Sequence, residues 1–385
     1  MYKNKTGLFI YSLVFLSEFS FFFALPILAQ QSSFSASQVG FAFSLAIVIE
    51  SVVMISMAGF LHSKSRSNVL SISLILRSIA YLFLVAIDTI MSWYLFFAIL
   101  AISKSLSKPI LREVLINTVA EKDIKISMNY YSFFQNFAIV IAPIVAVVSI
   151  QVSIEKYFFF SISFINFVCV YFSYKLVYST ASKNNNDVKQ YNNPFKYIGL
   201  LSKDKTILLL MVSIFFTVFL MQIFITVTTL LPRTRSDFSE YVSLFFTIVG
   251  VTICVWQGII AKHIKFNDNT MLLLLTILGG ILSLLFMGNL FVAILALIAY
   301  SIFESILVPH IYYNASIVKA IIPQNVLFSF ILVSGNIGGA LGAYLTGIII
   351  DFAEWNITLV LTIMIAISVI LSILPIYRIK KGENI

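Results

Sequence analysis

The sequence has 385 residues, of which 60% are apolar and only 11% are charged, and its mean hydropathy is +1.01. Soluble domains contain roughly 45–50% apolar and about 25% charged residues, so this composition excludes an ordinary soluble protein. The net charge of +9 would suit a nucleic-acid-binding protein, but the positions of the basic residues give it another cause. The two cysteines stand alone in apolar runs and predict neither a disulfide framework nor a metal site.

Long apolar segments follow one another along the chain. A membrane-spanning helix needs roughly 20 apolar residues, because the hydrocarbon core is about 30 Å thick and each helical residue rises about 1.5 Å. This criterion predicts twelve spans, six on each side of a polar segment centred on residues 182–190. The predicted spans are residues 7–29, 39–61, 69–87, 91–111, 128–151, 157–177, 206–231, 239–261, 270–288, 290–313, 326–350 and 357–377. We therefore predict an all-α membrane protein.

Lysine and arginine are distributed unevenly between the two sides of the predicted membrane. With both termini in the cytoplasm, 19 of the 25 Lys and Arg residues fall in cytoplasmic segments or at the cytoplasmic end of a span, three fall outside and three lie deep within spans. An excess of basic residues in cytoplasmic loops sets the orientation of membrane proteins. We therefore predict a multi-pass protein of the cell membrane, in a bacterium the cytoplasmic membrane, with both termini inside. This distribution also explains most of the positive charge without a nucleic-acid partner.

The two sets of six predicted helices echo each other. Residues 95–101 read LFFAILA and residues 290–296 read LFVAILA, and the glycine-and-basic segment 59–66 resembles segment 258–265. Two parallel repeats about an axis normal to the membrane are typical of one large class of transporters. We therefore predict two six-helix bundles related by pseudo-two-fold symmetry. The predicted boundaries are 1–177 and 206–385, with a cytoplasmic linker at 178–205.

The segment after the second span resembles the glycine-and-basic loop of the major facilitator superfamily. Gly59, Lys64 and Arg66 match that loop, in which Ser63 stands where the family has an acidic residue. The resemblance covers essentially the whole chain. It implies alternating access by two bundles, with a gating role for this loop.

The fifth span resembles the glycine–proline motif that the same family associates with antiporters. Ala138, Ala142 and Pro143 occupy the motif, with alanine in the glycine positions. The resemblance implies a gating role for Pro143 and favours the proton-driven drug and sugar efflux branch of the family.

Six ionisable residues lie deep within the predicted spans, where a charge at the bilayer centre costs about 2.5–3.5 kcal/mol unless it is paired, hydrated or functional. They are Glu18, Glu50, Arg77, Lys104, Lys108 and Glu304. Lys104 and Lys108 are four residues apart and therefore lie on one face of their helix. A pair such as Glu18–Lys104 would neutralise the interior. Pairs that only fix packing are the alternative for each residue, and an inter-helix pair is the default for Glu50 and Arg77.

The family resemblance places helices 1, 4, 7 and 10 around a central cavity, and so implies that four of these charges lie near it. We predict Glu18 and Glu304 as proton-coupling residues. Phenylalanines surround Glu18 at helical spacing, and apolar surroundings favour the neutral form of a carboxyl group. The predicted substrate-binding residues are the two lysines and four amides: Lys104, Lys108, Gln135, Asn136, Gln222 and Asn336. These amides are also able to bond neighbouring helices instead.

The prediction for function is proton-coupled export of a small organic solute by alternating access, that is, antiport. A proton-coupled uptake symporter is the alternative within transport. A lipid flippase or a membrane-embedded enzyme is the alternative from another class. The sequence contains no catalytic constellation, metal-ligand spacing or phosphate-binding glycine loop, so we predict no enzyme activity and no cofactor or metal. The predicted partners are the solute, protons and the lipid bilayer, and the predicted state is a monomer.

Overall fold

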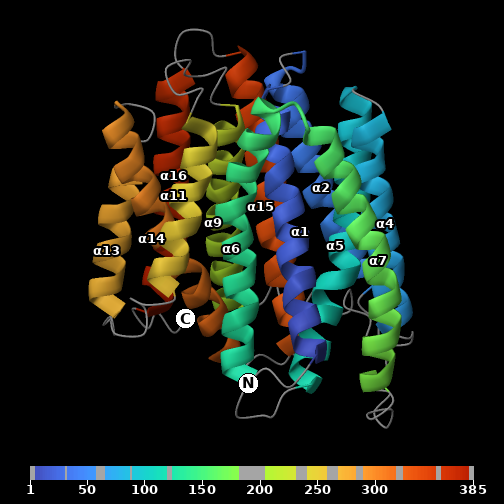
Figure 1. Ribbon diagram of the computed structural model, residues 1–385. Helices are drawn as coiled ribbons and strands as arrows, with labels where there is room; N and C mark the ends of the chain where they lie inside the picture. The colour runs from blue at the N-terminus through green and yellow to red at the C-terminus, as the bar shows by residue number, and fades with distance from the viewer. Residues whose placement is uncertain are drawn as a thin grey trace. The chain divides into compact units, whose positions relative to one another are not determined.

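The computed structural model describes eleven stretches of the chain, and all of its regular elements in them are helices (Figure 1). The described residues are 5–30, 33–57, 66–86, 89–118, 124–181, 204–230, 241–257, 268–282, 289–317, 324–352 and 357–380. The helices there are α1 (Lys5–Gln30), α2 (Ala36–Met57), α4 (Arg66–Ala86), α5 (Ile90–Thr118), α6 (Ile124–Gln151), α7 (Glu155–Ala181), α9 (Lys205–Thr229), α11 (Val242–Val255), α13 (Asp268–Leu282), α14 (Leu290–Ile317), α15 (Gln324–Phe352) and α16 (Ile357–Lys380).

Ten of these helices are long and apolar enough to cross a membrane. Helices satisfy their own backbone hydrogen bonds, which is why apolar segments of this length adopt them in lipid. The other two, α11 and α13, are shorter apolar helices, and the predicted spans that contain them continue into residues outside the described part. Each of the twelve predicted spans thus corresponds to one helix, and the predicted all-α membrane fold is confirmed.

The chain forms two compact units. The first contains residues 1–28 and 49–193, and the second contains residues 29–48 and 194–385. Helix α2 therefore belongs to the second unit in its first half and to the first unit in its second half. The predicted linker, residues 178–205, lies almost entirely outside the described residues.

Serine side chains join the helices of the first unit. Helix α4 packs against both α5 and α7. Ser78 of α4 and Ser163 of α7 each donate to the other's backbone carbonyl, at 2.9 and 2.8 Å. Ser73 of α4 and Ser103 of α5 make the same reciprocal pair, at 3.0 and 2.8 Å. Small hydroxyl residues allow close helix approach and satisfy their own polar atoms in an apolar interior.

Glycines join the main helix pair of the second unit, α9 and α15. A methyl group at Gly338 of α15 would overlap the carbonyl oxygen of Phe215 of α9. One at Gly342 would lie 2.5 Å from the carbonyl oxygen of Phe219. These glycines therefore serve helix packing, since the two backbones touch where side chains are absent.

Candidate functional site: a buried charge cluster and a lone carboxyl group

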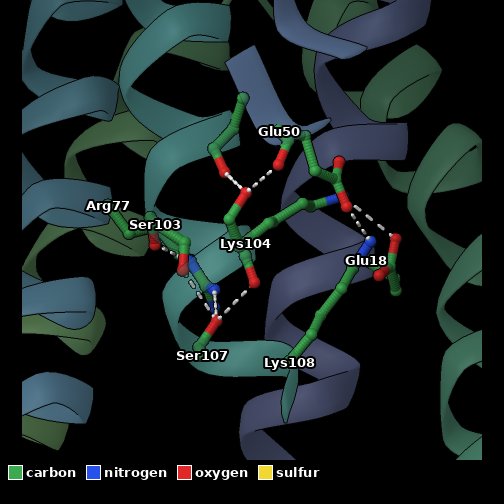
Figure 2. Close-up of polar contacts among 9 residues, drawn as sticks. Glu18, Glu50, Arg77, Ser103, Lys104, Ser107 and Lys108 are labelled. Carbon is green, nitrogen blue, oxygen red and sulfur yellow. Dashed lines mark hydrogen bonds and ion pairs between the residues drawn. The ribbon is translucent and has the colours of Figure 1, made fainter. Parts of the chain in front are cut away.

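Helix α5 carries the basic residues of the candidate site. Lys104 and Lys108 project from the same face, as their spacing predicts. The Nζ atom of Lys104 lies 3.1 Å from a carboxylate oxygen of Glu18 on α1, and the Nζ atom of Lys108 lies 2.9 Å from one of Glu50 on α2 (Figure 2). The suggested Glu18–Lys104 pair is therefore present, and Glu50 makes the expected inter-helix pair.

The two ion pairs form one cluster, in which each charge acts on more than its own partner. Glu18 interacts electrostatically with both lysines, and Lys104 interacts electrostatically with both glutamates. The inner pair is more buried: the side chains of Lys104 and Glu18 are 9% and 13% exposed, against 31% and 19% for Lys108 and Glu50. Opening the inner pair therefore costs more than opening the outer one, because its charges would face a drier environment.

Phenylalanines around the inner pair have a different role from the predicted one. The ammonium group of Lys104 lies 4.4 Å from the centre of the Phe21 ring, so the ring face supports the cation. Phe21 in turn meets the Phe97 ring edge to face, at 6.0 Å between centroids. The expectation that apolar neighbours favour neutral Glu18 is corrected here: the ammonium group at 3.1 Å favours the charged carboxylate.

Arg77 of α4 lies fully buried, at 1% exposure, on another side of α5. Its Nε donates to the Ser103 hydroxyl at 3.3 Å, and its Nη2 donates to the Ser107 hydroxyl at 3.1 Å. Among the described residues Arg77 forms no salt bridge, and its inter-helix partners there are serine hydroxyls of the neighbouring helix. These two bonds fix α5 against α4 on either side of Lys104 (Figure 2).

The second unit holds an acid in a different setting. Glu304 lies half-buried in α14 and accepts a hydrogen bond from the Tyr300 hydroxyl one turn earlier. The Tyr300 ring stacks on Phe224 of α9, with 4.4 Å between ring centres. No described residue forms a salt bridge with Glu304, in contrast to Glu18 and Glu50.

Buried ion pairs and an acid without a salt bridge to any described residue suit a membrane transporter. A comparison of sequences identifies the family. The family model described as "Major Facilitator Superfamily" matches residues 7–318. The chain belongs to the Major Facilitator Superfamily. No curated protein was found to match the sequence.

Solved transporters of the superfamily share the fold over nearly the full chain. The nucleoside transporter NupG has a TM-score of 0.75 and 14% identity, with 98% of this chain and 99% of that chain covered. A peptide transporter, POT, in complex with sulfate has a TM-score of 0.73 and 12% identity, covering 98% and 95%. The human organic anion transporter MFSD10 has a TM-score of 0.64 and 13% identity, covering 95% and 98%.

Membership of the superfamily makes this chain a transporter rather than an enzyme, with two six-helix bundles as predicted. The three similar structures are named for different solutes, nucleosides, peptides and organic anions. Identities of 12–14% establish a shared fold only, so these names assign neither a substrate nor a direction of transport to this chain.

The predicted amide ligands divide between the two units of this superfamily member. Gln135 and Asn136 are half-buried in α6 of the first unit, and Gln222 and Asn336 are half-buried in α9 and α15 of the second. Gln222 also packs against the α9–α15 seam, since a methyl group at Gly339 would lie 3.0 Å from its Cγ. The structure leaves these four as candidates for solute binding.

The predicted gating residues are only partly described. Gly59 and Lys64 lie outside the described residues, and Arg66 begins α4 without a described side chain. Pro143 lies buried inside α6. The gating roles of all four therefore stay predictions. Among the described residues, no group of His, Cys, Asp and Glu is placed to hold a metal ion.

Sequence reasoning missed the serines that support the lysines. Ser103, Ser105 and Ser107 lie next to Lys104 and Lys108 in α5, and Ser105 donates to the backbone carbonyl of Glu50 at 3.1 Å. That bond fixes α5 against α2 next to the Lys108–Glu50 pair. The signal was visible as a serine at every second position between the two lysines, a pattern unusual for a lipid-facing helix.

Proposed function

We propose that this protein is a proton-driven exporter of a small organic solute, which exchanges solute for protons by alternating access. The observation that carries the proposal is the contrast between its buried acids. Glu18 and Glu50 each have a lysine within about hydrogen-bond distance, whereas Glu304 has only the Tyr300 hydroxyl among the described residues.

An acid without a cationic partner inside a membrane protein needs a proton or a cationic group to neutralise it. If proton and solute neutralise the same carboxylate, only one of them binds at a time. Each then displaces the other, because linkage between two ligands is reciprocal. Glu304 is therefore our main proton-coupling residue, and the competition at its carboxylate gives exchange in opposite directions.

The charge cluster of the first unit supplies the second part of the mechanism. Lys104 and Lys108 are already neutralised, so a solute reaches them only when an ion pair opens. The more exposed Lys108 is the first contact for an anionic or hydroxyl-rich group, and protonation of Glu18 would free Lys104. The amides Gln135, Asn136, Gln222 and Asn336 supply hydrogen bonds that orient the solute.

Replacing Glu304 by Gln tests the exchange. Inverted membrane vesicles are energised to an acidic interior, and the pH gradient is followed with quinacrine fluorescence while solutes are added. The solutes are methyl viologen, p-toluenesulfonate, methyl glucoside, uridine and a dipeptide. We expect at least one to dissipate the gradient in wild type and none to do so in Glu304→Gln. Glu155→Gln, which removes a carboxyl group at the first residue of α7, is the control and retains the response.

Two results would contradict the proposal. The first is a Glu304→Gln variant that still dissipates the gradient at the wild-type rate. The second is wild-type accumulation only in right-side-out vesicles with an acidic exterior, which is the behaviour of a symporter.

Proton-coupled uptake is the second candidate, and the Glu18–Lys104 pair favours it. Protonation of Glu18 leaves Lys104 positively charged and available, so a proton and an anionic solute would bind in the same state and move together. Under this candidate, Glu18→Gln binds p-toluenesulfonate or another anion without a proton. Its anion binding then loses the pH dependence that the wild type shows.

The remaining assignments concern where and how the protein works. We propose a bacterial cytoplasmic membrane, both termini inside and a monomer as the working unit. The charge count across the predicted spans supports the orientation, with 19 basic residues on the inner side and three on the outer side.

A further inference from the structure

The first turn of α2 has an incomplete cap. Ser35 and Gln38 form a reciprocal capping box, in which the Ser35 hydroxyl accepts the Gln38 N–H at 3.2 Å and Gln38 Oε1 accepts the Ser35 N–H at 2.8 Å. The start of a helix leaves four N–H groups without an intrahelical partner, and a capping box bonds only some of them. The N–H groups of Ala36 and Ser37 remain.

Asp351, near the end of α15, accepts hydrogen bonds from both of these N–H groups. Its Oδ1 accepts the Ala36 N–H at 2.9 Å, and its Oδ2 accepts the Ser37 N–H at 2.7 Å. The hydroxyls of Ser35 and Ser37 also bond this carboxylate. A negative charge at a helix N-terminus is favourable, and here it comes from more than 300 residues away in the chain.

Below this cap, the two helices touch backbone to backbone. A methyl group at Gly40 of α2 would lie 2.5 Å from the Ala343 carbonyl oxygen, and one at Gly347 of α15 would lie 2.5 Å from the Ala36 carbonyl oxygen. One aromatic pair accompanies these small residues: the rings of Phe41 and Tyr344 meet edge to face, with 6.4 Å between their centroids. Residues 29–48 are part of the second compact unit, together with α15.

We infer that Asp351 is a latch residue of the transport cycle, which holds the end of the protein at residues 33–40 and 343–352 closed and releases it when that end opens. The inference rests on the proposed alternating access. In the orientation that the basic residues predict, this is the outer end. The sequence places α2 in the first predicted bundle and α15 in the second. Alternating access therefore requires the start of α2 to separate from α15.

The bonds of the latch suit repeated opening. Asp351 is exposed, so water can replace each of its hydrogen bonds when the two helices part. Opening the seam of small residues also separates the Phe41 and Tyr344 rings, which are both exposed and contact each other only edge to face. Helix α2 also carries Glu50, 14 residues from Ala36 and so about 21 Å along a rigid helix. A movement of the first turn of α2 therefore also displaces Glu50 relative to Lys108.

The test uses the protein in membrane vesicles, with Cys169 and Cys254 replaced by Ser and a single reporter, Gln222→Cys. A sulfonated, membrane-impermeant maleimide is added from the outer side, and the rate of labelling is measured. We expect Asp351→Asn to label at least 10-fold faster than the parent, because its amide group cannot accept both N–H bonds and the open state gains population.

A matched control is available at the start of α9. Asp204 caps its own helix by accepting the N–H groups of Thr206 and Ile207, at 2.9 and 3.1 Å. Asp204→Asn removes a carboxylate cap without touching a second helix, so its labelling rate should stay at the parent value. Ser37→Pro weakens the latch on the α2 side, because it deletes the N–H group that Asp351 Oδ2 accepts. Proline is tolerated in the first turn of a helix, so the helix should still form and labelling should be faster than in the parent.

Unchanged labelling in both Asp351→Asn and Ser37→Pro would overturn the latch, as would an equal increase in Asp204→Asn. Labelling needs no transported solute, so it separates the two proposals. Faster labelling with no wild-type transport keeps the latch and rejects the exporter, while transport with unchanged labelling does the reverse.

Discussion

The two compact units differ in the contacts that hold their helices together and in the partners of their buried acids. In the first unit, serine hydroxyls bridge α4 to α5 and α7, and its two buried acids are each matched by a lysine. In the second unit, glycine backbones touch between α9 and α15, and Glu304 has no described salt bridge. The first unit is thus built around paired charges, and the second around close backbone contact, with one carboxyl group that forms no salt bridge to a described residue.

The sequence repeat shows how far the halves have diverged. The segment at residues 95–101 recurs 195 positions later, at residues 290–296. The helices themselves are offset by 200 positions, since α5 begins at Ile90 and contains Pro109 while α14 begins at Leu290 and contains Pro309, so Lys104 corresponds to Glu304 and Lys108 to Val308. The two lysines are therefore absent from the matching positions of the second unit, and an acid, Glu304, stands where the first unit has Lys104. Related scaffolds thus hold unlike chemistry.

The largest effect is expected where glycine contact is broken. Gly338→Ala places a methyl group on the Phe215 carbonyl oxygen, and a backbone oxygen cannot rotate away. We expect a loss of about 3 kcal/mol or more in the free energy of unfolding, the upper range for overpacking. Little folded protein should then be recovered in detergent size-exclusion chromatography.

Gly280→Ala in α13 is the matched control, since its methyl group would meet nothing within 4 Å. Alanine is the better helix former by about 1 kcal/mol, so this variant should be as stable as wild type or more stable. If both variants behave alike, the glycine seam is not what holds the second unit together.

The next effect concerns the balanced charges of the first unit. Lys104→Met leaves Glu18 buried without its nearest cation, which typically costs about 3–5 kcal/mol. We expect the lower end of that range, because Lys108 and Arg77 also act on Glu18. Thermal unfolding in detergent measures the loss.

The double variant Glu18→Gln/Lys104→Met separates charge balance from side-chain packing. It removes both charges, so it should recover most of the stability that Lys104→Met loses. A double variant no more stable than Lys104→Met would show that packing, rather than ionic balance, governs this part of the first unit.

Sequence reasoning reached the fold because apolar length and charge asymmetry act along the chain. Every predicted span contains a helix, and the spacing of Lys104 and Lys108 set their shared face. The partners depended on how helices pack. Arg77 bonds Ser103 and Ser107 because α5 presents hydroxyl groups to α4. The bond between Asp351 and α2 could not be predicted from neighbouring residues, since the two segments are distant in sequence and meet only in the folded chain.

The smallest effect tests the serine contacts, which are numerous but individually weak. Ser78→Ala removes the donor to the Ser163 carbonyl and the hydroxyl pair between the same residues, at 2.9 and 2.8 Å. Inter-helix hydrogen bonds in membranes average about 0.6 kcal/mol and reach about 1.7, so we expect a loss of about 1 kcal/mol. The fall in melting temperature should be much smaller than that of Gly338→Ala. A loss as large as the glycine variant's would mean that hydroxyl pairing is as decisive for the first unit as backbone contact is for the second.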